Sequence, residues 1–267
     1  MIKFFRKIRQ DLLAKKQLNK YLMYAFGEVI LVMVGILLAL FISNWNNNRI
    51  EVKKERWYLV NIVEDLIYQK VILEDMRDFN IETIETCKSI LKDYSIHKNF
   101  AKIDSLNHRL NDLLITYDFP NVNNTYTELV SSGQFGLIKD KTISIDIINY
   151  YLNSDENAKS TNSDIVNIFY PEISTAINQF SEVEVYDEDI KEGEEYLLDL
   201  DKEISKHLNK LLTKTSTKLT LINAIKTKIH LQNTHLILAK ETLSLNDSLI
   251  KKIDKYLGLT PEMVNPY

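Results

Sequence analysis

The chain has 267 residues, 45% of them hydrophobic, and a formal net charge of −4 at pH 7. This length can bury one sizeable core or two small ones, and the nearly neutral charge gives no support for nucleic-acid binding. A single cysteine, Cys87, excludes an internal disulfide and a cysteine-based metal site. Glycine and proline are scarce and strand-like alternation is hard to find, so the sequence predicts an all-α fold.

Residues 1–20 predict a basic amphipathic cytoplasmic segment, because Ile2, Phe5, Ile8 and Leu12 recur at helical spacing. Such a segment lies on an anionic leaflet with its apolar face down. The basic residues that would bind this leaflet are Lys3, Arg6, Lys7, Arg9, Lys15, Lys16 and Lys20. A plain flank that only sets membrane topology explains the same charges equally well.

Residues 21–44 predict a single transmembrane helix that has Glu28 as its only charge. A membrane core of about 30 Å needs roughly 20 helical residues, so the uninterrupted apolar run 29–42 is too short to cross alone. The polar flank 43–48 is costly to bury, so the missing turns come from residues 21–27, which places Glu28 below the headgroups. Three aromatic residues then fall near the two interfaces, as an aromatic belt requires: Tyr21, Tyr24 and Trp45.

Basic residues outnumber acidic ones more strongly before this helix than after it, which favours a cytoplasmic N-terminus and an exported C-terminal domain. The bulky residues 40–45 offer no cleavage site for a signal peptidase. The sequence therefore predicts a retained signal anchor in a bacterial inner membrane, with the C-terminal domain in the periplasm.

Two features of the predicted span suggest contact with another membrane helix. Glu28 either sits shallow and hydrated or makes a polar contact to a partner helix. Gly35, Ala39 and Ser43 recur every four residues and form a small face that permits close helix packing, although such residues are also common in spans by chance.

Residues 45–267 predict a helical soluble domain of elongated bundle type. Its first long helix covers about 48–94 with an apolar stripe that includes Cys87, and it either continues the span or follows it. Cys87 on that stripe is expected to be a buried, inert thiol.

Further helices are expected over about 104–181. Asp104 is predicted to cap the first, Asn124 or Thr125 the second, and Asp140 a third. Gly133 is expected in a left-handed helix cap. The polar stretch 153–163 predicts a loosening of the third helix, and Pro171 a kink or an end.

Residues 182–195 predict an acidic loop, and a calcium loop beginning at Asp187 fails because Lys191 and Glu192 occupy its fifth and sixth positions. The last long helix, about 217–257, is expected to end at Gly258 and Pro261. Its surface is expected to be basic, and the residues assigned to that surface include Lys218, Lys226, Lys228, Lys240, Lys251, Lys252 and Lys255. Attraction between this surface and the acidic loop is expected to be weak.

Candidate sites for chemistry are few. His230 and His235 are five residues apart, which does not fit a helical zinc pair. Tyr150 and Tyr151 line a ligand pocket or, as aromatics at helical spacing more often do, the core. No phosphate loop, nucleophile elbow or dinucleotide motif is present, so we expect no cofactor and no enzyme activity.

Short motifs in this sequence resemble an uncharacterised family of Bacteroidota single-span membrane proteins that is catalogued as a domain of unknown function. The resembling motifs are MIKFFRKIR at residues 1–9, Lys20-Tyr21, Tyr24-Ala25, Gly27-Glu28, Gly35-Ile36-Leu37, Ala39-Leu40, Asn44-Trp45-Asn46 and a second block within residues 126–138. Phe41 departs from the pattern, which has a polar residue there, often Gln. The resemblance implies a single-span anchor with a helical body and lends no activity.

The sequence thus predicts a membrane-anchored interaction or scaffolding protein whose partners are the lipid bilayer and another membrane protein or further copies of itself. The alternative is an extracytoplasmic ligand-sensing domain. Such a sensor would signal through a partner, because about 20 cytoplasmic residues cannot hold an output domain.

Overall fold

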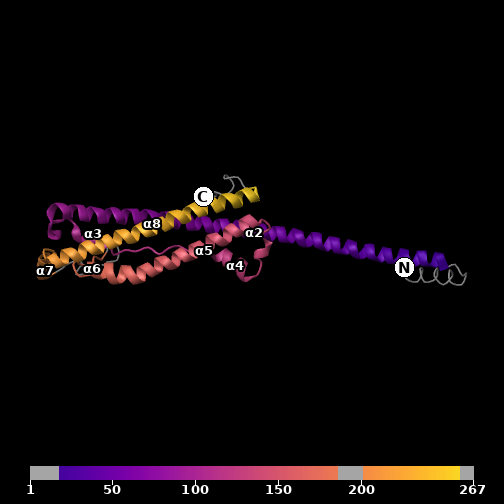
Figure 1. The fold of residues 1–267 in the computed structure, drawn as a ribbon, viewed down its shortest axis with the longest axis horizontal. Helices are drawn as coiled ribbons and strands as arrows, with labels where there is room; N and C mark the ends of the chain where they lie inside the picture. The colour runs from indigo at the N-terminus through magenta and orange to yellow at the C-terminus, as the bar shows by residue number, and fades with distance from the viewer. Residues whose placement is uncertain (1–17, 186–200, 259–267) are drawn as a thin grey trace, which may run out of the picture. The chain divides into compact units, whose positions relative to one another are not determined.

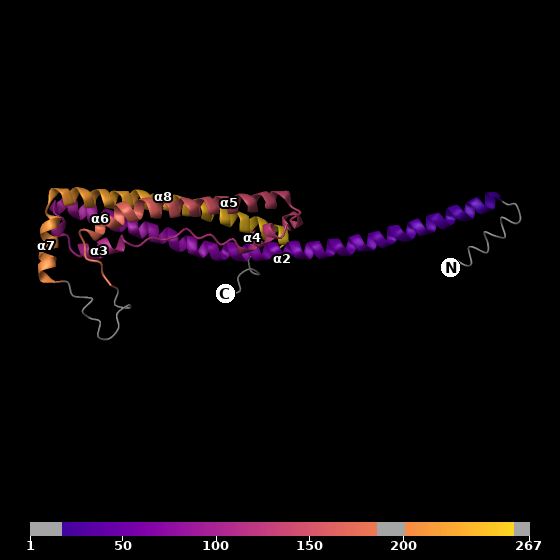
Figure 2. The same ribbon diagram turned by 90° about the horizontal axis from the view of Figure 1, so that it is seen from below.

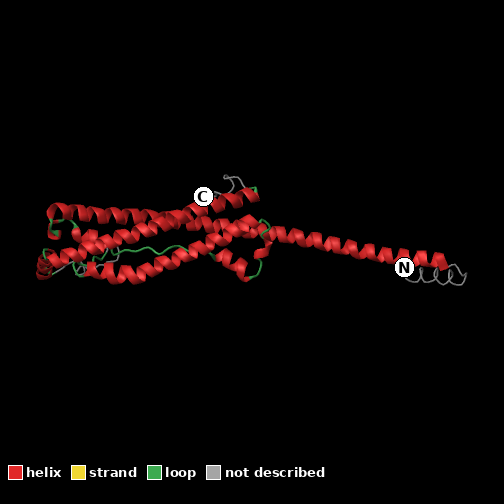
Figure 3. Ribbon diagram, viewed as in Figure 1, coloured by secondary structure: helices red, strands yellow, loops and turns green. Residues whose placement is uncertain are grey.

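The computed structural model describes residues 18–185 and 201–258, and within these ranges it contains helices and no strands (Figure 3). The predicted all-α class, with an apolar N-terminal helix followed by a helical bundle, is confirmed. The chain divides into two compact units, one ending at Trp57 and one beginning at Tyr58.

The first long helix, α2, runs without interruption from Leu18 to His97. The predicted helix over 48–94 is therefore the later part of a helix that begins before the expected span. Within the second unit, Leu59, Ile62 and Leu66 on α2 are fully buried at the predicted spacing of three or four residues. Cys87 is buried as expected, and burial raises the pKa of its thiol to about 12, which keeps the thiol protonated.

Two predicted helix caps are displaced by one residue. Helix α3 spans Leu106–Asp112 after a short 3-10 turn, η1 (Phe100–Lys102), and its N-cap is Ser105 in a left-handed conformation, not Asp104. Helix α4 spans Asn124–Ser131, and its N-cap is Asn123. The side chain of Asn123 makes no capping bond. Instead, the backbone N–H of Thr125 donates to Asp65 on α2 at 2.9 Å, a cap supplied from 60 residues away.

Helix α5 spans Lys141–Asp164 after a 3-10 turn, η2 (Phe135–Leu137). The predicted caps are confirmed: the Asp140 side chain accepts from the backbone N–H groups of Thr142 and Ile143, and Gly133 has φ +68°. The predicted loosening over 153–163 is wrong, because the helix continues through this stretch and Ser154, Asn157 and Thr161 face the bundle interior.

Pro171 lies inside a π-helical stretch, η3 (Ile165–Ser174), that leads into α6 (Thr175–Asn178). Proline lacks the N–H that an α-helix would bond, and the wider π turn accommodates it here. Helix α7 (Lys202–Leu212), capped by Asp201, was not predicted. Helix α8 spans Thr215–Leu257 and ends at Gly258 with φ +67°, as expected. Residues 186–195 of the predicted acidic loop, and Pro261, lie outside the described residues.

The core of the second unit lies between α2, α5 and α8, which run side by side (Figures 1 and 2). Buried contacts at two levels give their directions. Leu59 of α2 clusters with Ile143 of α5 and Ile253 of α8, and further along α2 Cys87 clusters with Ile165, directly after α5, and Ile225 of α8, so α5 runs parallel and α8 antiparallel to α2. Hydrogen bonds join the three helices: Gln69 of α2 donates to Ser154 Oγ at 2.8 Å, and Asn246 Nδ2 of α8 donates to the carbonyl of Leu66 at 2.9 Å. An extended segment between α3 and α4 returns along the bundle, and its Pro120 carbonyl accepts from Gln69 at 2.8 Å.

Three clusters of buried side chains follow one another along this bundle. The first, here called the apolar end, includes Tyr58, Leu59, Ile62, Val63, Leu66, Leu129, Ile138, Ile143, Ile147, Tyr150, Tyr151, Leu249 and Ile253. A small middle cluster contains Leu73, Met76, Phe119, Ala239 and Leu243. The third, the distal cluster, includes Cys87, Ile90, Phe100, Leu110, Ile165, Phe169, Leu221, Ile225 and Leu231.

Candidate functional site

Among the described residues, α2 is the one helix long and apolar enough to cross a membrane, and its apolar window lies near the N-terminus with a mean hydropathy of 2.7. From Leu22 to Ile42 every side chain is exposed except those of Ala25 and Glu28, which are partly covered. An apolar surface open on all sides is what lipid or another apolar helix would cover.

The structure places the predicted membrane residues as follows. Tyr24 and Trp45, 54% and 61% exposed, lie on the same helix at the two ends of its apolar stretch. Lys20 and Tyr21 belong to α2, but their side chains are not described. The remaining predicted leaflet-binding residues lie outside the described residues: Lys3, Arg6, Lys7, Arg9, Lys15 and Lys16.

Helical geometry brings Glu28 and two of the small residues, Gly35 and Ala39, to one face of α2. At about 100° per residue, Glu28, Gly35 and Ala39 fall within about 40° of one another, and Ser43 lies about 40° beyond Ala39. A Cβ placed on Gly35 would meet no atom within 4 Å. Packing within the described chain therefore does not require glycine at this position.

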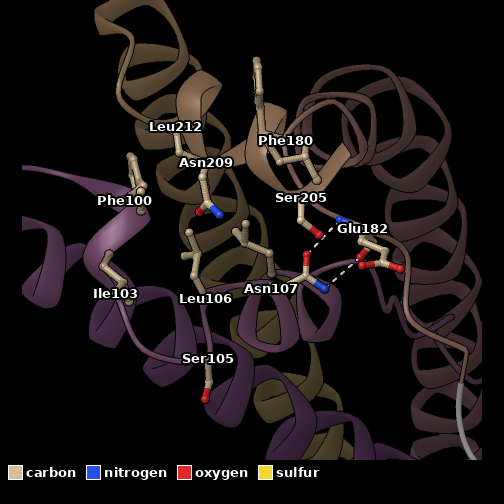
Figure 4. Close-up of a pocket in the computed structure, with 13 residues that line it drawn as sticks. Phe100, Ile103, Ser105, Leu106, Asn107, Phe180, Glu182, Ser205, Asn209 and Leu212 are labelled. Carbon is tan, nitrogen blue, oxygen red and sulfur yellow. Dashed lines mark hydrogen bonds between the residues drawn. The ribbon is translucent and has the colours of Figure 1, made fainter. Parts of the chain in front are cut away.

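The second unit contains a cavity of about 310 Å³ near η1, α3 and α7 (Figure 4). This volume lies at the low end of the range of about 300–1,000 Å³ seen for small-molecule sites. Its lining is mainly apolar and comes from Phe100, Ala101, Ile103, Leu106, Leu110, Phe180, Leu208 and Leu212, with Ser105, Asn107, Glu182, Ser205 and Asn209 as polar members. Figure 4 shows Asn209 directed toward the space beside Leu106, whereas Ser105 points away from it.

Two asparagines on α3 fix one wall of this cavity. Asn107 accepts from the backbone N–H of Glu182 at 2.8 Å and donates to its carbonyl at 3.1 Å. Asn111, one turn later, donates to the same carbonyl at 2.7 Å and accepts from the N–H of Glu184 at 2.9 Å. The backbone of the segment after α6 is thereby hydrogen-bonded by side chains of α3, at the N–H and C=O groups that a neighbouring strand would bond in a sheet.

The cavity has few charged groups. The nearby Glu184 carboxylate bonds the His108 ring at 2.8 Å and thereby raises the pKa of that histidine, which is exposed to solvent. The side chains that line the cavity include one carboxylate, Glu182. Apolar side chains with a few hydrogen-bonding groups among them are a lining typical of small-molecule sites.

Sequence reasoning missed this cavity because its walls come from three short, separate elements. The spacing of Asn107 and Asn111 was the available signal, since residues four apart share a helix face. Helix α7, which supplies Ser205 and Leu212, follows the acidic stretch and was not recognised as a helix.

The tyrosines singled out in the sequence belong to the core, as the favoured interpretation held. Tyr150 and Tyr151 are 2% and 3% exposed, and the Tyr151 ring stacks on Tyr126 with centroids 4.3 Å apart. Burial raises the pKa of both phenols. Within the described residues, no group of three or more His, Cys, Asp or Glu side chains is placed to hold a metal ion.

No curated protein and no solved structure matches the chain significantly. The model of a family of unknown function, DUF6090, matches residues 28–182. The match begins at Glu28 in the apolar part of α2, includes the 126–138 block, and ends at Glu182 on the cavity wall. Since this range exceeds half of the chain, the protein belongs to the DUF6090 family, a family of unknown function.

Proposed function

We propose that this protein is a membrane-anchored, non-catalytic interaction or scaffolding protein of the bacterial cell envelope. In this proposal α2 crosses the inner membrane once as a signal anchor, with the N-terminus in the cytoplasm and the helical unit in the periplasm. The observation that carries the proposal is that Glu28 shares one face of an apolar helix with Gly35 and Ala39, two small residues that the described chain leaves exposed.

The chemistry of this face fits a partner helix better than lipid. An ionised carboxylate within the bilayer costs on the order of 2.5–3.5 kcal/mol at the centre and less near the interface. A polar contact with a second helix offsets part of that cost, and small residues two and three turns further along permit the backbones to approach closely. A second copy of this chain or another membrane protein supplies such a helix.

Cysteine crosslinking in membranes tests the proposal. Ala39→Cys lies on the common face, and Leu37→Cys, about 160° around the helix from Ala39, is the matched control. If the partner is a second copy, oxidation links two copies through Ala39→Cys and not through Leu37→Cys. If the partner is another protein, it co-purifies with the wild type and is lost from Gly35→Leu, while Val34→Leu retains it. A chain that stays monomeric and isolated in both assays contradicts the proposal.

A second candidate function, ligand sensing, rests on the cavity lined by α3 and α7. In this alternative a small apolar molecule with one hydrogen-bonding group binds there, and a partner membrane protein carries the signal. Screening such molecules for a rise in the melting temperature of the full chain tests this candidate. The rise should disappear in Leu106→Trp, which fills the cavity, and persist in Leu219→Trp, an exposed position on α8. A rise that Leu106→Trp leaves unchanged would place the ligand elsewhere.

A further inference from the structure

A band of polar side chains, most of them buried, crosses the bundle between the middle and the distal clusters. On α2, Asn80 and Thr83 lie between Met76 of the middle cluster and Cys87 of the distal one. On the other two helices the band contains Thr161 and the half-buried Asp164 of α5, and Gln232 and His235 of α8. We call these six residues the polar layer.

Three side chains of the polar layer are buried and only partly bonded. Asn80, Thr161 and Gln232 are 1%, 0% and 2% exposed. Within the part of the chain that the structure describes, Asn80 Nδ2, Thr161 Oγ1 and Gln232 Nε2 have no hydrogen-bond partner. Each buried polar group without a partner costs roughly 1–3 kcal/mol, so these three atoms weaken the bundle at this level.

The same layer contains a buried histidine. His235 is 2% exposed and its Nε2 lies 3.2 Å from Asp164 Oδ2. Lys228, two turns earlier on the same face of α8, is fully buried. Its ammonium donates to the carbonyl of Ile115 at 2.8 Å and lies 4.4 Å from the centre of the Phe169 ring.

The charges around His235 oppose one another. Burial lowers the pKa of His235 most, Asp164 on α5 raises it, and Lys228 on α8 lowers it further. From α2, Cys87 acts on Lys228. The net effect keeps the ring neutral in the closed bundle, whereas the ring of an opened bundle takes up a proton at its ordinary pKa.

We propose that the polar layer is an acid-sensitive break in the core of the helical unit: a proton on His235 separates α5 from α8 at this level and admits water to the three unpaired polar atoms. Because the open form binds the proton more readily, opening becomes more frequent as the pH falls below about 6.5. The frequency of opening stops rising at the pH at which His235 is protonated in the closed form too.

Hydrogen exchange of the full chain in lipid nanodiscs tests this inference. After correction for the intrinsic pH dependence of exchange, amides of residues 155–168 and 228–240 should exchange faster at pH 5.5 than at pH 7.5. Because pH 5.5 lies only about one unit below the ordinary pKa of histidine, the factor should not exceed about tenfold. Amides of residues 143–151, at the apolar end, should not change. Faster exchange at pH 5.5 in residues 143–151 as well as at the polar layer, or in neither place, overturns the proposal.

Two variants separate the histidine from other acid effects. In His235→Gln the acceleration should vanish, and an unchanged acceleration overturns the proposal. In Asp164→Asn, which keeps the ring but removes the carboxylate that favours its proton in the closed bundle, the acceleration should still begin at about pH 6.5 and should level off at a lower pH than in the wild type. If neither variant folds, NMR of the His235 ring in the unmodified chain decides, because the ring of the closed bundle must titrate below about pH 6.5, where the acceleration levels off. Titration of the ring at or above about pH 6.5 overturns the proposal.

Discussion

The apolar end and the polar layer lie on the same three helices and differ in the side chains that face the interior of the bundle. At the apolar end, Leu59, Ile62 and Leu66 of α2 meet apolar side chains from α4, α5 and α8. In the polar layer the corresponding inward positions carry amides, hydroxyls and an imidazole. The first arrangement supplies stability through apolar burial. We expect the second to fix the register of the helices, since polar pairs such as His235 with Asp164 tolerate no sliding.

The largest effect is expected from a cavity at the apolar end. Leu66 is fully buried there, so Leu66→Ala should lower the free energy of unfolding by about 2–5 kcal/mol. Val71→Ala, at an exposed position on the same helix, should change it by less than about 0.5 kcal/mol. Urea titration of the full chain in micelles, followed by helical circular dichroism, measures both. Similar midpoints for the two variants would mean that the apolar end does not dominate stability.

Because Lys228 is buried beside the polar layer, it should make the free energy of unfolding rise as the pH increases. Burial lowers the pKa of Lys228 to about 8 in the folded protein from an ordinary 10.5. Between these values the unfolded chain holds a proton that the folded one has lost, so Lys228 adds stability as the pH rises. Its contribution from pH 8 to pH 9 is about 1 kcal/mol.

Comparison with Lys228→Met isolates this contribution, because Cys87 acts in the opposite direction. The folded state raises the pKa of the Cys87 thiol, so the unfolded chain loses that proton first and stability falls above about pH 9. Urea midpoints at pH 8 and 9 should therefore rise more in the wild type than in Lys228→Met. Equal changes in the two proteins would show that Lys228 is charged or neutral in both states over this range.

The smallest effect is expected within the polar layer itself. Thr161→Val keeps the shape of the side chain and removes a buried hydroxyl that has no partner among the described residues. At pH 7.5 we expect stabilisation by about 1 kcal/mol, opposite in sign to truncation at the apolar end. Thermal melting of the two proteins side by side decides the sign. Destabilisation would indicate that the hydroxyl is bonded, for example to an ordered water.

The parts of the fold that could be predicted from sequence are those governed by local chemistry. Asp140 and Gly258 mark helix ends that depend on neighbouring residues alone, and both predictions are confirmed. Helix α4 begins one residue earlier than predicted, where Asp65 of α2 caps it, and no local pattern reveals a cap supplied from another helix.

Buried polar residues account for the larger errors. Residues 153–163 looked like a break because Ser154, Asn157 and Thr161 interrupt the apolar period, yet all three face inward. Lys228 was assigned to a basic surface and is instead fully buried. Periodicity identifies an inner face only where that face is apolar. The polar layer was for that reason invisible in the sequence, and so was the cavity built from three separate elements.

The hydrogen bonds that cross the bundle also constrain the order in which the chain can assemble. Lys228 bonds a carbonyl 113 residues earlier, and Asn246 bonds one 180 residues earlier. During synthesis α2 and α5 are complete well before α8 exists, so their inner faces and the extended segment wait for their last partner. Contacts over such separations are slow to form and leave apolar surface open meanwhile. Productive folding of this helical unit therefore depends on its final helix, and truncation within α8 should yield aggregated chains rather than a smaller bundle.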